Sequence, residues 1–201
     1  GVATYARSLS RRLKELGAEV GVLYGHRSSS GADELLREVT FFDPRSGGPG
    51  WKRLVDDLKG MARLRLGTDA VEVPVTGRVE PGAMAARMPA FDRIWNIPGL
   101  YRAATLASAP ARRFGRLRLP QRPALMHWTY PVPLEVEGVP NIYTIHDLVP
   151  LRLPATTLDN KRRYLGTVRR IAANAAHVVT VSEASRRDII NLLGVAEERV
   201  T

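Results

Sequence analysis

The sequence predicts an α/β fold in which a mostly parallel, Rossmann-like sheet is flanked by helices. Short runs rich in β-branched and aromatic residues have the length and composition of buried strands, at 19–24, 124–128, 141–145 and 177–181. Amphipathic segments with an apolar residue every three or four positions lie before or after them, at 2–16, 51–66, 158–176 and 183–193. Helices that alternate with buried strands are typical of a parallel sheet.

The composition is that of one globular domain. The 201 residues are 44% apolar and 25% charged, and we expect a single domain over 1–201 that is cut at both ends. The chain holds no cysteine, which excludes disulfides and cysteine metal sites, and its 4 histidines lack the spacing of metal ligands. No apolar run approaches the roughly 20 residues of a membrane span, and no signal-peptide pattern opens the chain. We therefore expect a cytoplasmic protein with no bound metal or cofactor.

Basic residues dominate the charge. The formal net charge is +10 and the sequence pI about 10.6, which favours anionic partners. No acidic residue lies between Asp92 and Glu135, and we expect this segment to form two helical pieces broken near Pro110. If its arginines face anionic lipid, each adds about 1 kcal/mol of attraction, enough for peripheral attachment at the inner membrane face. The arginines are Arg93, Arg102, Arg112, Arg113, Arg116, Arg118 and Arg122.

The amino-terminal part reads as a helix, a turn and a strand. One apolar stripe predicts a helix over 2–16, Gly17 is its expected left-handed terminator, and a strand follows at 19–24. A glycine at the start of a helix lets backbone N–H groups approach a phosphate, so Gly1 is a candidate phosphate contact. A tight turn explains the same glycine. Next come an expected loop with a short helix or strand at 34–42, a helix at 51–66, a half-exposed strand at 71–75 and an irregular segment at 81–89.

The carboxyl-terminal part carries the candidate site. His127 lies inside a predicted strand and is expected to face the interior, whereas Tyr130 lies in the loop after that strand and is a candidate binding residue. His146 and Asp147 directly follow the next strand. Prolines 150 and 154 are expected to interrupt regular structure, and Thr156 or Thr157 to cap the helix at 158–176. Ser182 is expected to cap a second helix that ends at Gly194, with Arg186 one turn into it.

Four junctions follow predicted strands or open a helix after one. They are Gly1, Thr129–Tyr130, His146–Asp147 and Ser182–Glu183. Because the carboxyl ends of parallel strands meet at one edge of a sheet, and ligands collect there, we expect these junctions to lie at a common edge. Periodicity predicts a site in this way, but no reaction.

Three motifs resemble one known family. The run G-V-A-T-Y-A-R-S-L opens the chain, T-I-H-D-L-V-P-L occupies 144–151, and K-R-R-Y-L with V-V-T-V-S-E-A-S-R-R-D-I lies within 161–189. Together they resemble the N-terminal domain of retaining glycosyltransferases of family 4, which have the GT-B fold of two facing Rossmann-like domains. The resemblance is close over 1–25 and 142–201, and the middle of the chain shows only the same order of elements.

The resemblance implies transfer of a sugar from a nucleotide-sugar donor to an acceptor, with retention of configuration and no metal. Gly1 matches the second glycine of the family's Gly-Gly loop, whose backbone meets the donor diphosphate. His146 matches the family's histidine near the transferred sugar, and Asp147 then orients it or caps the loop. Ser182 and Arg186 are expected near the donor and Tyr130 near the acceptor. The donor-binding second domain is expected beyond this chain, so the fragment alone should be inactive.

Two other functions fit the sequence less closely. A non-catalytic basic module would use the 93–122 face to bind an anionic membrane or polyanion, although a solvated face without a partner explains the same charge. A nucleotide-sugar epimerase of the same two-domain architecture would consume donor without acceptor. Nucleic acid ranks behind these partners because the segment lacks interleaved aromatic residues and any zinc-finger or helix-turn-helix pattern.

Overall fold

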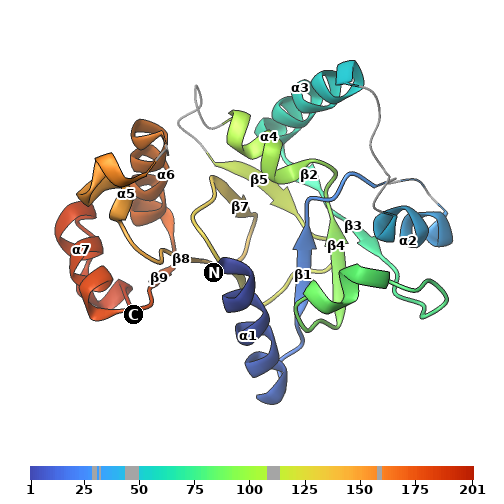
Figure 1. Ribbon diagram of the computed structural model, residues 1–201, viewed down its shortest axis with the longest axis horizontal. Helices are drawn as coiled ribbons and strands as arrows, with labels where there is room; N and C mark the ends of the chain where they lie inside the picture. The colour runs from blue at the N-terminus through green and yellow to red at the C-terminus, as the bar shows by residue number, and fades with distance from the viewer. Residues whose placement is uncertain (29–30, 32, 44–49, 108–113, 158–159) are drawn as a thin grey trace. The chain divides into compact units, whose positions relative to one another are not determined.

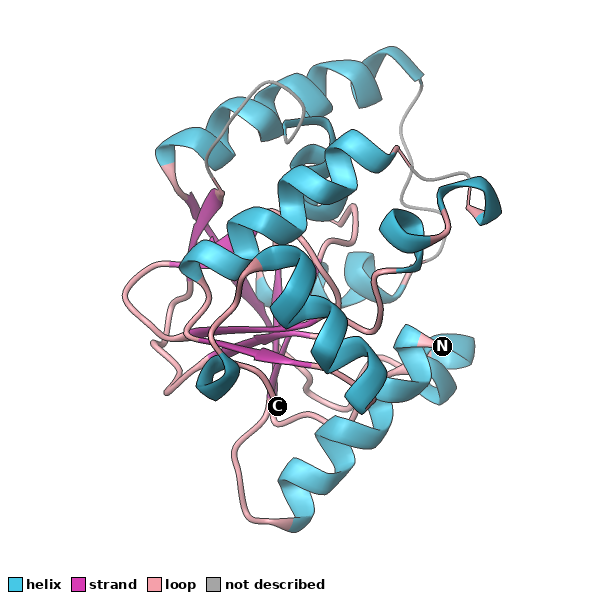
Figure 2. Ribbon diagram, turned by 90° about the vertical axis from the view of Figure 1, so that its left-hand side faces the viewer, coloured by secondary structure: helices cyan, strands magenta, loops and turns pink. Residues whose placement is uncertain are grey.

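The computed structural model describes residues 1–28, 31, 33–43, 50–107, 114–157 and 160–201. The chain forms two compact units, which are described separately: unit 1 comprises 1–103 and 117–121, and unit 2 comprises 104–116 and 122–201. Helices and short, mostly parallel strands make up the regular structure (Figures 1 and 2). The predicted α/β, Rossmann-like class is confirmed.

The sheet of unit 1 is built around β4 (Arg93–Asn96). Strand β1 (Gly21–Tyr24) pairs with it in parallel, and β3 (Val71–Val73) pairs with its other side in antiparallel orientation. Ile94 on β4 is fully buried and packs with Phe41 and Val73. Removing these apolar side chains from water stabilises the fold. A second short parallel pair joins β2 (Thr68–Asp69) to the end of β5 (Gly115–Arg118).

The helices of unit 1 follow the predicted pattern closely. Helix α1 (Val2–Glu15) ends as expected, because Gly17 adopts a left-handed φ of 81° and its N–H bonds the carbonyl of Lys14. Asp33 caps α2 (Glu34–Phe42) by accepting from the N–H of Leu36. The unit also holds α3 (Gly50–Leu66) and the 3₁₀ helix η1 (Gly82–Arg87), which lies in the segment expected to be irregular.

The acid-free segment is only partly helical. Its first predicted piece is confirmed as α4 (Leu100–Ala107), whereas the second is wrong, because Phe114 begins a stretch that forms strand β5. Leu117 is fully buried between two solvent-facing arginines, which is the alternation of a strand. Strand β4 was also not predicted there. The expected break near Pro110 lies outside the described residues.

Unit 2 contains a parallel sheet in the order β6-β8-β9. Strands β6 (Met126–Trp128), β8 (Asn141–Thr144) and β9 (His177–Val179) pair side by side, and Val200 makes an isolated parallel bridge to Val178. Strand β7 (Leu134–Val136) lies between β6 and β8 in sequence but outside this sheet, so the chain returns to β8 without a crossover helix. Tyr143 is almost fully buried and stacks on Trp128, with ring centroids 6.2 Å apart.

Three helices lie beside this sheet (Figure 1): α5 (Val149–Arg152), α6 (Lys161–Asn174) and α7 (Glu183–Leu193). Two predictions about α7 are confirmed: Ser182 caps it, and Gly194 ends it with a φ of 66°. The α6 prediction is wrong at its start, because Asn160 rather than Thr156 or Thr157 is the cap. Proline 150 did not prevent a helix, since it occupies the first turn of α5, where its missing N–H costs nothing. Two 3₁₀ turns complete the unit, η2 (Pro154–Thr156) and η3 (Glu197–Arg199).

Candidate functional site

The structure brings three of the four predicted junctions to one edge of the unit 2 sheet. Thr129 follows β6, His146 lies two residues beyond β8, and Ser182 lies three residues beyond β9. All three strands run in parallel, so these residues share the carboxyl edge. Short hydrogen bonds tie the edge together, since Ile145 donates its N–H to the carbonyl of Val179 over 2.9 Å.

His146 is held at this edge through both its ring and its backbone. Ring Nε2 lies 3.0 Å from the carbonyl oxygen of Thr129. A carbonyl only accepts, so Nε2 carries the proton and Nδ1 is the acceptor of the neutral ring. The Thr180 hydroxyl donates to the carbonyl of Ile145 over 2.7 Å and reaches that of His146 at 3.5 Å. The imidazole is therefore fixed in orientation before any ligand arrives.

Asp147 makes two hydrogen bonds that hold the loop after β8. Its carboxylate accepts from the N–H of Val149 over 3.0 Å, and its carbonyl accepts from the hydroxyl of Tyr164 over 2.8 Å. These contacts fit the loop-capping alternative for Asp147. They also identify Tyr164, which the sequence predicted only as part of an apolar helix face, as a residue that positions this loop.

Tyr130 is half-buried in the loop after β6. Burial raises its pKa to about 12, so the phenol stays protonated at neutral pH. A neutral phenol both donates and accepts hydrogen bonds, which suits it to contact hydroxyl groups. Its role in binding an acceptor stays a prediction.

Ser182 and Arg186 are occupied by local structure. The Ser182 hydroxyl accepts from the N–H of Ser185 over 3.2 Å, as a helix cap does. The Arg186 guanidinium donates to the carbonyl of Val200 over 3.1 Å and to the carboxylate of Glu197 over 2.9 Å. Arg186 thus ties α7 to the end of the chain, and a donor contact by either residue stays a prediction.

Gly1 belongs to unit 1, where it precedes α1. Its carbonyl accepts from the N–H groups of Thr4 and Tyr5, the described residues include no side-chain capping bond at this position, and the first turn of the helix holds no acidic residue. Among the described residues, no atom lies within 4 Å of the position a Cβ would take. Packing within the described chain therefore does not require glycine here.

The predicted basic face is largely neutralised by ion pairs. Carboxylates from distant parts of the sequence meet its arginines, so the absence of acidic residues in the segment does not leave a bare cationic surface. The pairs are Arg93 with Glu19 and Glu72, Arg102 with Asp57, Arg116 with Glu137, and Arg118 with Asp69. Arg112 and Arg113 lie outside the described residues. Membrane binding by 93–122 stays a prediction.

A polar cluster in unit 1 was not predicted. Buried Asn96, the last residue of β4, accepts from the N–H of His26 over 2.8 Å and donates to its carbonyl over 2.9 Å. It also donates to the hydroxyl of Ser28 over 2.8 Å. This cluster lies at the carboxyl edge of the β1–β4 pair. One feature of the sequence could have indicated this cluster. Asn96 follows the apolar pair Ile94–Trp95, and a polar residue after an apolar pair is typical of the end of a strand.

The described residues contain no group of three or more His, Cys, Asp or Glu side chains that could hold a metal ion. None of the helices in the described part of the chain is both long enough and apolar enough to span a bilayer.

Comparison with known proteins identifies the family. No curated protein matches the chain. The family model described as Glycosyltransferase Family 4 matches residues 1–201, which is the entire sequence. The match agrees with the α/β fold and with the motifs around Gly1, His146 and Ser182. The chain therefore belongs to glycosyltransferase family 4.

Proposed function

We propose that this chain is the acceptor-side domain of a retaining glycosyltransferase, one half of a GT-B enzyme that uses a nucleotide-sugar donor. The observation that carries the proposal is the placement of His146, whose ring is fixed by Thr129 at the carboxyl edge of a parallel sheet. Ligands of such sheets bind at that edge. The second, donor-binding domain and its carboxylates belong to the continuation of the protein.

His146 would meet the sugar undergoing transfer. With Nε2 bonded to Thr129, the imidazole is oriented and could exchange a hydrogen bond with a hydroxyl of that sugar. A fixed group of this kind needs no reorganisation as charge develops, which is how preorganised donors lower a barrier. Asp147 and Thr180 would contribute indirectly by holding the loop.

The start of α1 would receive the donor diphosphate. The structure describes no side-chain capping bond at Gly1, and the helix dipole favours an anion there by about 0.3–1 kcal/mol per contact. The leaving nucleoside diphosphate gains negative charge during transfer, so such donors stabilise the transition state selectively. Positioned donors supply this stabilisation without a metal ion, as the family resemblance implies.

The acceptor would approach Tyr130, whose protonated phenol suits a hydroxyl-bearing molecule. A cytoplasmic location, where nucleotide-sugars are made and used, fits the proposal.

The test uses the full-length protein with a panel of nucleoside-diphosphate sugars and measures release of the nucleoside diphosphate. His146→Ala should lower turnover by about 100-fold to 1,000-fold, the range for losing one preorganised donor, while circular dichroism and the unfolding midpoint stay unchanged. His177→Ala is the matched control, because His177 opens β9 at the opposite edge of the same sheet. Normal turnover in His146→Ala, or an equal loss in His177→Ala, would contradict the proposed site.

A further inference from the structure

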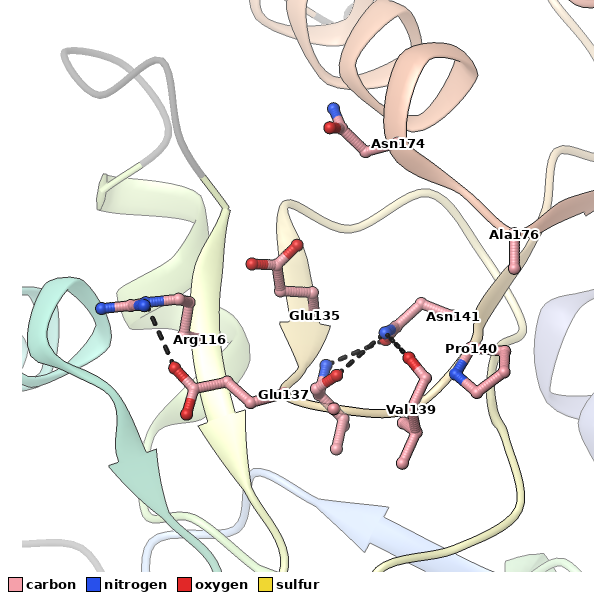
Figure 3. A pocket seen from close by; sticks show the side chains of 10 residues that line it. Arg116, Glu135, Glu137, Val139, Pro140, Asn141, Asn174 and Ala176 are labelled. Carbon is pink, nitrogen blue, oxygen red and sulfur yellow. Dashed lines mark hydrogen bonds and ion pairs between the residues drawn. The ribbon is translucent and has the colours of Figure 1, made fainter.

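A pocket of about 540 Å³ lies at the amino edge of the unit 2 sheet, where the proposed reaction has no component. It is lined by Asn141 at the start of β8, Ala176 just before β9, Glu135 and Glu137 near β7, and Arg116 of β5 (Figure 3). Pockets of this volume accommodate small organic molecules and are much larger than a single metal ion requires.

Three of the lining side chains are already paired. Arg116 lies 3.3 Å from the carboxylate of Glu137. Asn141 accepts from the indole N–H of Trp128 and the N–H of Val136, and donates to two carbonyls of the β7–β8 turn. These contacts hold the walls of the pocket, and they use the full hydrogen-bonding capacity of the Asn141 amide.

Glu135 is different, because no described residue donates a hydrogen bond to its carboxylate. Figure 3 shows it apart from the dashed contacts that join Arg116 to Glu137 and Asn141 to its neighbours. Burial raises the pKa of Glu135, as does neighbouring Glu137, whereas Arg116 lowers it. A half-buried carboxylate without a donor is costly, and a cationic ligand would relieve that cost.

Asn174 adds a further acceptor to the pocket. It ends α6, one N–H of its Nδ2 bonds the carbonyl of Arg170 over 2.8 Å, and its Oδ1 can accept from a ligand. The carboxyl end of α6 adds the negative end of a helix dipole, and its last turn holds no basic residue to offset it. Two carboxylates and one guanidinium give the pocket a net charge of −1 in a chain whose formal charge is +10.

We propose that this pocket binds an organic ammonium ion, with Glu135 as its charge partner and Oδ1 of Asn174 as a further acceptor. The site is separate from sugar transfer and does not depend on the proposed function. Two kinds of molecule present such a group at this size: a linear polyamine and an amino sugar.

Isothermal titration calorimetry of the 201-residue chain at pH 7 tests the site with spermidine, glucosamine and glucose. We expect saturable binding of at least one amine and none of glucose, which matches glucosamine except for the ammonium group. Tighter binding of spermidine assigns the pocket to polyamines, and tighter binding of glucosamine assigns it to amino sugars. Binding of neither amine at millimolar concentration, or equal binding of glucose, would overturn the proposal.

Three variants localise the binding. Glu135→Gln should weaken it at least tenfold, whereas Glu198→Gln, which removes the same charge from an exposed residue outside the pocket, should leave it unchanged. Arg116→Gln should tighten it, because it removes the only cation among the lining side chains. If Glu135→Gln and Glu198→Gln weaken binding equally, the attraction is a general charge effect and the pocket is not the site. Thermal unfolding of each variant verifies its fold.

Discussion

Three histidines near the ends of parallel strands in unit 2 differ in what surrounds them. His127 lies within β6 with its Nε2 2.8 Å from the hydroxyl of Thr144, as the predicted interior orientation requires. His177 opens β9 and pairs with the hydroxyl of Thr201. His146 lies beyond the end of β8 on a backbone carbonyl. Position along a strand therefore separates the structural histidines from the candidate catalytic one.

Burial of His127 should make stability depend on pH. Burial lowers the pKa of its imidazole from the ordinary 6.5. As pH falls through 6.5, the unfolded chain takes up a proton at this histidine that the folded chain does not. The free energy of unfolding therefore decreases as the pH is lowered. Urea unfolding at pH 7.5 and 5.5 should therefore reveal a smaller acid-induced loss in His127→Asn than in the native chain.

His177→Asn is the control for removal of an imidazole elsewhere in the same sheet, and the change in pH dependence is judged from His127→Asn relative to it. The comparison uses the difference between two pH values, so a uniform destabilisation of His127→Asn does not affect it. An unchanged pH dependence in His127→Asn would mean that other groups cause the acid sensitivity.

At the level of elements, amphipathic helices and apolar strands were predictable, whereas strands that interrupt an apolar run with charged residues were not. The helices at α1, α3 and α7 follow their apolar stripes. In contrast, β4 (R-I-W-N) and β7 (L-E-V) each contain a charged residue and form no continuous apolar run. Strand β5 was predicted as helix because two apolar residues three positions apart fit either structure. Pairing with β2, which lies far away in sequence, decides the outcome.

The cap of α6 provides a test of one corrected boundary. The Asn160 side chain accepts from the N–H of Arg163 over 3.0 Å, so Asn160→Ala should lower the free energy of unfolding by about 1 kcal/mol. Thr157→Ala should cost less, because no described residue bonds its hydroxyl. Urea unfolding of both variants measures the difference. A larger loss in Thr157→Ala would restore the original prediction of the cap.

At the scale of the whole molecule, the sequence predicted the fold class and three of the junctions at one edge. Local periodicity predicts strands, and parallel pairing follows from their alternation with helices. The ion pairs of Arg93 and Arg118 could not be predicted, because their carboxylate partners are 74 and 49 positions away. The same holds for Thr180, whose hydroxyl holds the His146 loop from another strand.

The pocket at the amino edge illustrates the same limit. Glu135 and Asn174 lie far apart in sequence, and only the return of the chain into β8 and β9 places both beside one cavity. The sequence predicted functional residues at the carboxyl ends of the strands, because polar residues follow the apolar runs there. It held no comparable pattern for a pocket at the amino edge of the sheet.

The central claim is that the carboxyl edge of the β6-β8-β9 sheet receives the sugar of the donor, and a separate proposal assigns the donor diphosphate to the start of α1. Hydrogen–deuterium exchange of the full-length protein, with and without the nucleotide-sugar that supports release, tests it most directly. The account predicts slower exchange at 2–6, 145–149 and 180–186 and unchanged exchange at 134–141. Protection confined to 134–141, or absent from 145–149, would contradict it.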